Sequence, residues 1–277
     1  MKLAVMGDFH YPCMQSKAEF HMVRDQFFGG LLEEFLDAEA DYHISIGDFT
    51  NEGRADELQF IFGAIQNHAH NRKFVHILGN HDTVSMPKDE ILKITGQQRY
   101  SAVDTDDAIL VFLDTTKEMD WKDFGGEIDE GQMVWLKKLI QESGEKTMIL
   151  FGHHPIEGTT QFSDKRMHAI HSEYEMWPVL SAKKGHGYYI CGHNHSNSIV
   201  HKEQWSFIQT AACLDILGYR MIELNQGKLS VSMIDLTNPE RLEAAASITK
   251  VMGHFTPNLN ATGEESDRTW ESVVQQS

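Results

Sequence analysis

Five short motifs between residues 7 and 195 constrain the fold of this chain more than any other feature. In each, a glycine directly precedes an aspartate, asparagine or histidine, and an apolar segment precedes the glycine. Strand ends hold side chains rigidly, so side chains that follow separate strands can converge at one rim of a sheet. The motifs are Gly7-Asp8-Phe9-His10, Gly47-Asp48-Phe49-Thr50-Asn51-Glu52-Gly53-Arg54, Gly79-Asn80-His81-Asp82, Gly152-His153-His154-Pro155 and Gly192-His193-Asn194-His195.

Strand-like and helix-like segments alternate along the first half of the chain. Residues 3–6, 42–46 and 74–78 are short apolar runs, whereas residues 17–40 and 54–67 have helical character. Further strands are expected at 108–113, 147–151, 187–191, 206–209, 219–224 and 229–234, with an amphipathic helix at 129–142. This alternation predicts an α/β fold in which helices flank the sheets.

Three segments depart from the regular pattern. Residues 115–128 and 157–174 are polar loops between ligand-bearing motifs, and their positions predict that they border a site. Residues 257–277 form a polar tail, which we expect to be a surface segment or a dimer contact rather than a catalytic part.

The bulk composition excludes some classes of protein. The net charge is −17 and no basic stripe is visible, which disfavours a nucleic-acid polymer as partner. A small phosphate ester is not excluded, because bound cations would supply local positive charge.

Localisation is predicted from apolar runs and cysteines. No apolar run approaches the roughly 20 residues that span a bilayer. The apolar start is too short for a signal-peptide core, and its cleavage would damage the first motif. The three cysteines are odd in number, which fits a reducing compartment. We therefore expect a cytoplasmic protein without a membrane partner.

The motifs carry the ligand types of a transition-metal centre. Asp8 and His10 are two residues apart, so both side chains face the same way in an extended chain. Asp48 can bridge two cations through its two oxygens, and Asn80 offers a neutral oxygen. With the imidazoles of His153, His193 and His195, these ligands suit Mn, Fe or Zn better than Ca or Mg. Two such metals about 3.5–4 Å apart can activate a bridging water and clamp phosphate oxygens.

This motif series resembles that of the calcineurin-like metallophosphoesterases, in particular the bacterial class III cyclic-nucleotide phosphodiesterases and the related glycerophosphodiesterases. The resemblance covers residues 1–236, which leaves a C-terminal helix and polar tail at 237–277. It implies a metallophosphoesterase sandwich of two mixed β-sheets flanked by α-helices. It also implies that one metal is held by Asp8, His10, Asp48 and His195, and the other by Asp48, Asn80, His153 and His193.

The same resemblance implies roles for residues beside the ligands. His81 corresponds to the histidine that faces the substrate and stabilises the phosphate or protonates the leaving oxygen. Asp82 could orient His81 as part of the catalytic machinery, or cap a turn. Asn51 stands where many family phosphatases have an aspartate, which favours the phosphodiesterase branch. We expect Asn80, His81 and Asn51 to contact the substrate.

Other residues near the motifs leave two interpretations open. For His154 we expect a structural role rather than a metal ligand. Trp121 and Phe124 could stack on a base or anchor their loop. His168 and His171 could line a pocket or belong to a solvated loop.

Together these features predict a dinuclear metal-dependent phosphoesterase that hydrolyses small phosphodiesters, either cyclic nucleotides or glycerophosphodiesters. A metal-bridged hydroxide would attack phosphorus while His81 assists the departing alkoxide. A phosphomonoesterase or nucleotidase with the same metals is the alternative. A non-catalytic binding module is a remote one, because such a protein would be expected to lose ligands. A homo-oligomer remains open.

Overall fold

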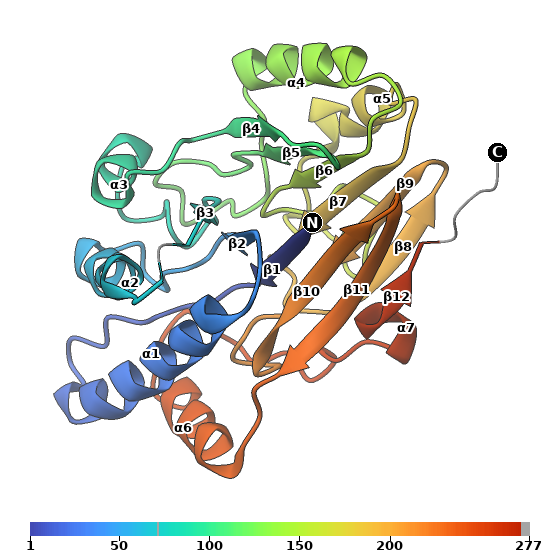
Figure 1. The fold of residues 1–277 in the computed structure, drawn as a ribbon. Coiled ribbons are helices and arrows are strands. Elements are labelled where there is room, and N and C mark those ends of the chain that lie inside the picture. Colours follow the sequence, from blue (N-terminus) through green and yellow to red (C-terminus); the bar gives the residue numbers. More distant parts are fainter. Residues whose placement is uncertain (71, 273–277) are drawn as a thin grey trace.

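Two mixed sheets of six strands each form the centre of the molecule (Figure 1). The computed structural model describes residues 1–70 and 72–272. The first sheet has the spatial order β12 (Trp270–Glu271), β11 (Lys228–Asp235), β10 (Gly218–Asn225), β1 (Lys2–Met6), β2 (Tyr42–Ser45) and β3 (Phe74–His76). The second has the order β4 (Ser101–Asp104), β5 (Ile109–Phe112), β6 (Met148–Phe151), β7 (Gly187–Cys191), β9 (Trp205–Gln209) and β8 (Ser198–Lys202).

The strands that precede the ligand motifs are parallel to their neighbours. In the first sheet β1 pairs in parallel with β2, and β2 with β3, while β10 joins β1 in antiparallel orientation. In the second sheet β6 pairs in parallel with β5 and β7. Parallel strands end at the same edge of a sheet, so the motifs that follow them lie close together.

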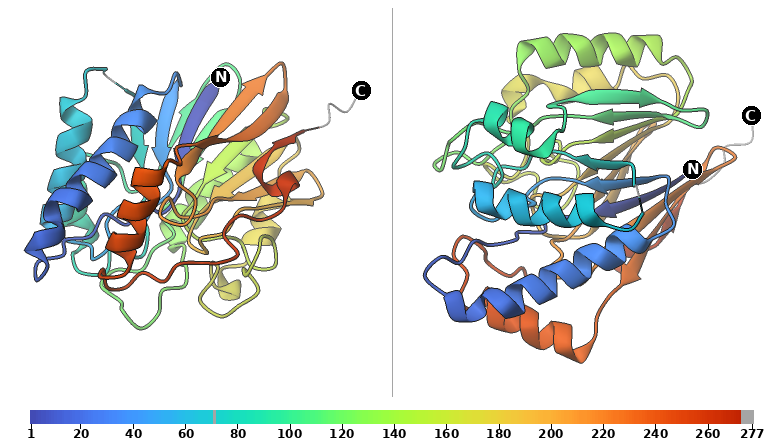
Figure 2. Two further views of the ribbon diagram at one scale, coloured as in Figure 1. Left: turned by 90° about the horizontal axis from the view of Figure 1, so that it is seen from below. Right: turned by 60° about the vertical axis from the view of Figure 1, so that its left-hand side comes forward.

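Helices cover the outer face of each sheet, which gives four layers (Figure 2). The first sheet packs against α1 (His21–Asp37), α2 (Ala55–Asn67) and α6 (Pro239–Thr249). The second packs against α4 (Glu130–Glu142) and α5 (Met176–Leu180). The short helix α3 (Lys88–Thr95) lies against α2. The remaining helical turns are η1 (Ala18–Phe20), η2 (Ser172–Tyr174) and α7 (Glu265–Arg268).

The period of two along each strand explains this layering. In β1, Leu3 and Val5 point into the core between the sheets, whereas Ala4 and Met6 pack under the helices. All four side chains are at most 1% exposed. Full burial of such an apolar side chain contributes about 1.5–3 kcal/mol. The central strands are therefore buried on both faces, as their continuous apolar sequence predicts.

The predicted sandwich of two mixed sheets with flanking helices is confirmed. The expected helix at 17–40 is shorter in the structure, where η1 leads into α1 and the helix ends at Asp37. The sequence analysis missed α3, β4 and β8, which are short elements. Within the described residues no helix has the length and apolarity needed to span a bilayer. The three cysteines are buried and unpaired.

Candidate metal centre

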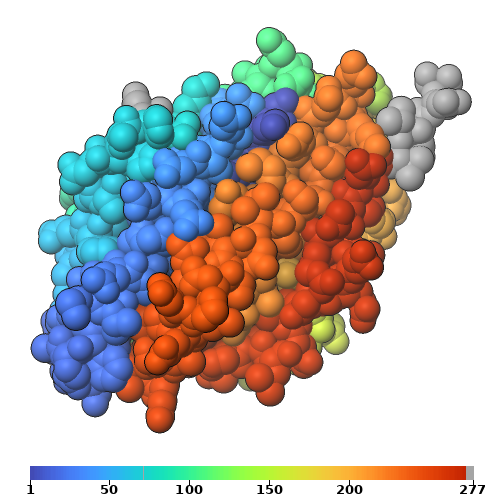
Figure 3. Space-filling view, turned by 60° about the horizontal axis from the view of Figure 1, so that its bottom comes forward, coloured from blue at the N-terminus to red at the C-terminus, as the bar shows by residue number. Residues whose placement is uncertain are grey.

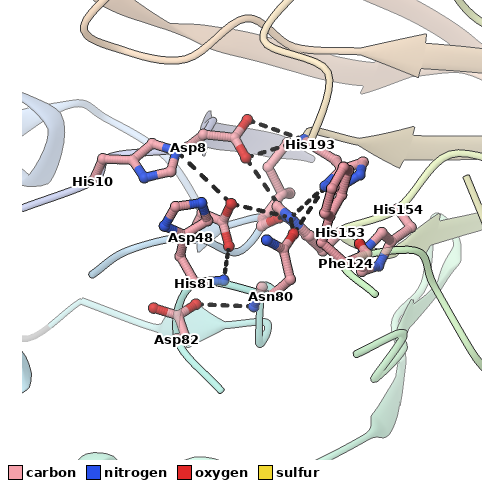
Figure 4. Close-up of polar contacts among 12 residues, drawn as sticks. Asp8, His10, Asp48, Asn80, His81, Asp82, Phe124, His153, His154 and His193 are labelled. Carbon is pink, nitrogen blue, oxygen red and sulfur yellow. Dashed lines mark hydrogen bonds and ion pairs between the residues drawn. The ribbon is translucent and has the colours of Figure 1, made fainter. Parts of the chain in front are cut away.

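The ligand motifs of both sheets meet at one place (Figure 4). Asp8 follows the end of β1, Asp48 follows β2 and Asn80 follows β3. His153 follows β6 and His193 follows β7. The centre therefore lies where the carboxyl ends of the parallel strands of the two sheets face one another, and no single sheet could build it.

The first ligand group matches the set implied by the family resemblance. Donor atoms of Asp8, His10, Asp48 and His195 all lie within 4.8 Å of one another. The Nε2 atoms of His10 and His195 are 3.0 Å apart, and His10 Nε2 is 3.7 Å from Asp48 Oδ2. His10 and Asp48 are almost completely buried. Two imidazole nitrogens and carboxylate oxygens that are buried together form a suitable site for a cation.

A second convergence follows from the tautomers of two histidines. His153 Nδ1 is 3.0 Å from the Ile46 carbonyl oxygen, so it carries the hydrogen and Nε2 presents a lone pair. His193 Nε2 is 2.9 Å from the Met167 carbonyl oxygen, so the lone pair of His193 is on Nδ1. Both lone pairs lie 2.9 Å from Asn80 Oδ1, which also accepts.

When His153 is neutral, these three acceptors point at one another and repel unless a cation lies between them. His153 Nε2 is also 3.3 Å from Asp48 Oδ2, which adds a carboxylate to the same group. This arrangement fits the second predicted ligand set, namely Asp48, Asn80, His153 and His193. Asp48 is shared by both groups, as expected for a bridging carboxylate.

His154 also lies close to His153 and His193, but both of its nitrogens are engaged elsewhere. Nδ1 lies 2.8 Å from Thr115 Oγ1, and Nε2 lies 2.9 Å from the carbonyl oxygen of Phe124. These contacts fit the predicted structural role, because the imidazole fastens the loop 115–128 to the metal centre.

The backbone at several ligands is strained. His10, Asp48, His193 and His195 have φ between 48° and 70°, where non-glycine residues are uncommon. Such conformations cost on the order of 1–3 kcal/mol each and persist only where the surrounding structure holds them. Gly47 lies against one of the ligands from the other sheet. A Cβ added at this position would lie 2.4 Å from His153 Nδ1. The glycine of this motif leaves room for a ligand from the other sheet.

Burial and neighbouring charge shift the ionisation of the ligands. Burial raises the pKa of Asp8 to about 7. Burial opposes the charged form of His153, but the Asp48 carboxylate outweighs this and raises its pKa to about 9. Burial holds the pKa of His10 and of His193 well below the ordinary value. His10 and His193 are therefore neutral, which is the form that binds a transition metal, whereas metal binding at His153 requires that this imidazole lose its extra proton.

Asp215, which the sequence analysis did not identify, lies behind His195. Its Oδ2 is 3.7 Å from His195 Nδ1, and its side chain is only 3% exposed. Burial raises the pKa of this carboxyl to about 7. A carboxylate behind a ligating imidazole commonly fixes the ring orientation. The only local signal was a single acid within the apolar run 211–217.

The predicted substrate-facing residues take different positions. His81 Nδ1 lies 2.7 Å from the carbonyl oxygen of Asn51, and the backbone N–H of His81 donates to Asp48 Oδ1 at 2.7 Å. The imidazole of His81 lines the cavity beside the ligands. It is thereby oriented by a backbone carbonyl and not by an acidic side chain.

The side chains of Asn51 and Asp82 are buried and do not line the cavity. The Asn51 side chain is completely buried, and its amide donates to the Gly253 carbonyl oxygen at 2.8 Å. Asp82 is buried too and accepts hydrogen bonds from Thr50 and from the Gly79 N–H. In the structure Asn51 orients His81 through its backbone, and Asp82 stabilises the turn that carries Asn80. The expected substrate contact of Asn51 is corrected accordingly. Of the two roles expected for Asp82, the contacts support the stabilised turn and not the orientation of His81.

A cavity of about 380 Å³ opens directly over these ligands. Both predicted loops border it, through Asp120, Trp121 and Phe124 on one side and His168 on another. His171 does not line it; this side chain contacts Lys117 and Asp123. Among the described residues, its lining includes no lysine or arginine. The full lining is Asp48, Asn80, His81, Val84, Asp120, Trp121, Phe124, His168, His193, His195, His254 and Thr256.

Comparison with known families agrees with this geometry. A family model described as calcineurin-like phosphoesterase matches residues 1–197. This chain belongs to the calcineurin-like phosphoesterase family. Members of this family use metal ions, and the two ligand groups described above are able to hold them. The chain is therefore a metallophosphoesterase by family and by ligand set.

Curated relatives within the family carry phosphodiesterase names. A probable cyclic nucleotide phosphodiesterase of Moraxella catarrhalis (strain BBH18) is 22% identical over 187 residues, 62% of this chain. The 3′,5′-cyclic adenosine monophosphate phosphodiesterase CpdA of Escherichia coli (strain K12) is 31% identical over 71 residues, 25% of this chain. The chain spans 65% and 25% of the lengths of these relatives, respectively.

Solved structures share the fold. A dimetal phosphatase from Danio rerio has a TM-score of 0.69 at 12% identity, covering 85% of this chain and 97% of that one. GAP50, the anchor in the inner membrane complex of Plasmodium, has a TM-score of 0.58 at 13% identity, covering 85% and 84%. At these identities the likeness establishes the metallophosphoesterase sandwich and nothing finer.

One part of the site lies outside the residues that the calcineurin-like phosphoesterase model matches. After α6 the chain returns over the centre, where Phe255 stacks on His195 with ring centroids 5.2 Å apart. Asn258 Nδ2 donates to the His195 carbonyl oxygen at 2.9 Å. Figure 3 shows this C-terminal stretch, in orange and red, as a continuous band across one face of the molecule.

The described part of the tail is mostly exposed, as expected for a surface segment, and these contacts add a supporting role to it. Asn258 supports a ligand loop, and Trp270 lies in β12 at the edge of the first sheet. The boundary at residue 236 stays a prediction, as does a homo-oligomer. The structure describes the tail as far as residue 272, and residues 273–277 lie outside the described range.

Proposed function

We propose that this chain hydrolyses phosphodiesters of small molecules, with cyclic nucleotides and glycerophosphodiesters as the substrate classes. The observation that carries the proposal is the convergence of acceptor atoms from Asn80, His153 and His193 beside a second group centred on Asp48, at the floor of a cavity. When bound, two transition-metal ions would lower the pKa of a water and neutralise phosphoryl oxygens.

The ligand residues supply fixed geometry for this chemistry. Asp48 is held by the His81 backbone N–H, and His153 is held by the Ile46 carbonyl oxygen. Strain at the ligand backbones and the absence of space around Gly47 leave these side chains little freedom. Fixed donors and acceptors need no reorganisation during the reaction, which is the main source of electrostatic catalysis.

His81 is the residue positioned to act on the leaving group. Its Nδ1 is engaged by the Asn51 carbonyl oxygen, so Nε2 is the nitrogen available to the cavity. When protonated there, the imidazole can give its proton to a departing alkoxide. General acid assistance of this kind contributes about 10²–10⁴-fold.

A diester is favoured over a monoester by the charge of the cavity lining. A phosphate monoester carries a second negative charge, which a lysine or arginine clamp would neutralise. Among the described residues, no lysine or arginine lines the cavity. Asp120 adds a further negative charge to the lining. Lys117, in the same loop, is paired with Asp123. The names of the two curated relatives point to the same reaction class.

The test compares the initial rates of the Mn-loaded protein on bis-p-nitrophenyl phosphate and p-nitrophenyl phosphate. We expect a clear preference for the diester. Preference for the monoester would contradict the proposal and indicate a phosphatase or nucleotidase with the same metal centre. Stoichiometric metal without hydrolysis of either ester would indicate a binding module.

A further inference from the structure

Part of the cavity lining is aromatic. Trp121 and His254 form a pair there, with ring centroids 4.8 Å apart and an interplanar angle of 47°. Phe124 lies on the His193 side, 5.9 Å from that ring. Trp121 is 52% exposed and Phe124 is 40% exposed, although both are large apolar groups. Aromatic surface left open inside a cavity is a place for a ligand to cover.

These rings are held in position before any ligand arrives. On one side, His154 Nε2 contacts the Phe124 carbonyl oxygen at 2.9 Å, and the Met119 N–H donates to the Thr83 carbonyl oxygen at 2.8 Å. The loop that carries Trp121 is thus fastened on both sides of that residue. A fixed pair of rings loses little conformational entropy when a flat group stacks on it.

His254 is fixed from the other side. The Asn51 amide donates to the carbonyl oxygen of Gly253, and Phe255 stacks on His195. The two partners of the aromatic pair therefore come from segments more than a hundred residues apart, and each is anchored next to a metal ligand or to His81. His254 lies beyond the residues that the family model matches.

The charges in the lining restrict what the flat group can be. Asp120 is next to Trp121, and its Oδ1 accepts from the Lys122 backbone N–H at 2.8 Å, which fixes the carboxylate. With no cation among the described lining residues, a second phosphate would be repelled. A carboxylate instead accepts hydrogen bonds from an exocyclic amino group.

Building on the proposed function, we propose that Trp121 and His254, with Phe124 and Asp120, form a subsite for the amino-bearing base of a nucleotide diester. The base stacks on the aromatic pair while the single phosphodiester lies over the metal ligands. Stacking of a base on an aromatic side chain contributes about 1–3 kcal/mol. Glycerophosphodiesters lack such a group and gain nothing from this subsite.

The first test compares Trp121→Ala with the wild-type protein, both loaded with Mn, on 3′,5′-cyclic AMP and on glycerophosphoglycerol. We expect kcat/KM for cyclic AMP to fall at least tenfold and that for glycerophosphoglycerol to change less than twofold. Trp121→Phe should recover most of the loss. Met119→Ala is the matched control, since Met119 is exposed in the same loop but does not line the cavity. An equal loss on both substrates would overturn the subsite.

A second measurement separates this proposal from the proposed function. Adenosine has no phosphate, so its binding to the metal-free full chain, followed by calorimetry, requires neither metal nor turnover. We expect binding that Trp121→Ala and His254→Ala each weaken at least fivefold, and uridine to bind more weakly than adenosine. No adenosine binding, or binding that neither substitution affects, would overturn the subsite even if diesters are hydrolysed. Adenosine binding by a protein that hydrolyses no diester would support the subsite and contradict the proposed function.

Discussion

At the residue scale, backbone carbonyls determine which nitrogen of each histidine faces the metal centre. Ile46 and Met167 fix the tautomers of His153 and His193, and Asn51 does the same for His81. A side-chain substitution cannot remove these carbonyl groups, so the direction of each lone pair depends on the main chain around it. Ligand and substrate-facing histidines are thus distinguished by where their free nitrogen points.

Removing the shared carboxylate and removing the substrate-facing imidazole should have different effects. Asp48→Ala is expected to abolish metal binding at both groups together with activity. His81→Ala should retain both metals and lose about 10²–10⁴-fold in rate on an alkyl diester, because only the proton donor is missing. Metal content by mass spectrometry and initial rates check both variants. Near-full activity of His81→Ala on an alkyl diester would contradict the role given to His81.

His43 provides a pH dependence that is independent of the metal ligands. It is buried in β2, with Nε2 3.2 Å from the Ala38 carbonyl oxygen. Burial, aided by the nearby Arg72 charge, lowers its pKa to about 4. As the pH falls below the ordinary pKa of histidine, the unfolded chain binds a proton at His43 more readily than the folded chain does. Stability is therefore lost between about pH 6.5 and 4.

The expected contribution of His43 is about 2 kcal/mol between pH 7 and pH 5. Urea unfolding of the metal-free protein at those two values, for wild type and His43→Gln, measures it. The variant, which cannot be protonated at this position, should lose less stability than wild type on acidification. The same loss in both proteins would show that His43 is not responsible.

The ligands could be predicted from sequence because each stands in a short motif after an apolar strand. Asp8, Asp48 and Asn80 needed only this local pattern, and the structure brings them together. Asp215 and His254 could not be predicted, because their positions beside the centre arise only when distant segments return to it. The direction of the Asn51 side chain likewise depends on Gly253.

At the element scale, the strand ends bring the ligands together because small residues let the two sheets approach each other. Gly47 has φ +100°, and an added Cβ would lie 2.4 Å from His153 Nδ1 and 2.9 Å from the Cα of Gly79. The glycine therefore serves both the turn after β2 and the arrival of a ligand from β6. Sequence alone indicated the turn but could not show which side chain fills the space.

Gly47→Ala should lower both stability and metal affinity. The left-handed backbone costs the alanine on the order of 1–3 kcal/mol, and the contact with His153 displaces a ligand. Gly63→Ala is the matched control, because Gly63 lies within α2 with open space around its Cα, and alanine there should stabilise by about 0.5–1 kcal/mol. Thermal unfolding and calorimetric titration with Mn²⁺ distinguish the two. Unchanged Mn²⁺ affinity in Gly47→Ala would contradict this explanation.

The elements that escaped prediction are short. Helix α3 has only eight residues, and β8 is an edge strand of five that follows directly after a ligand loop. Their formation depends on packing against α2 and pairing with β9, which local sequence does not reveal.

At the scale of the whole molecule, the two sheets and the C-terminal stretch jointly enclose one cavity. The first sheet supplies Asp8, His10, Asp48 and Asn80, and the second supplies His153, His193 and His195. The segment after α6 closes over His10 and His195 through Phe255. The family match ends before this closing segment begins.

The most direct test of a two-metal phosphodiesterase is a titration of the metal-free full chain with Mn²⁺. Binding is followed by calorimetry, and the rate on bis-p-nitrophenyl phosphate is measured at each point. We predict that binding saturates at two equivalents per chain and that the rate rises mainly with the second. Saturation of the rate at one equivalent, or hydrolysis that does not depend on metal, would contradict the account.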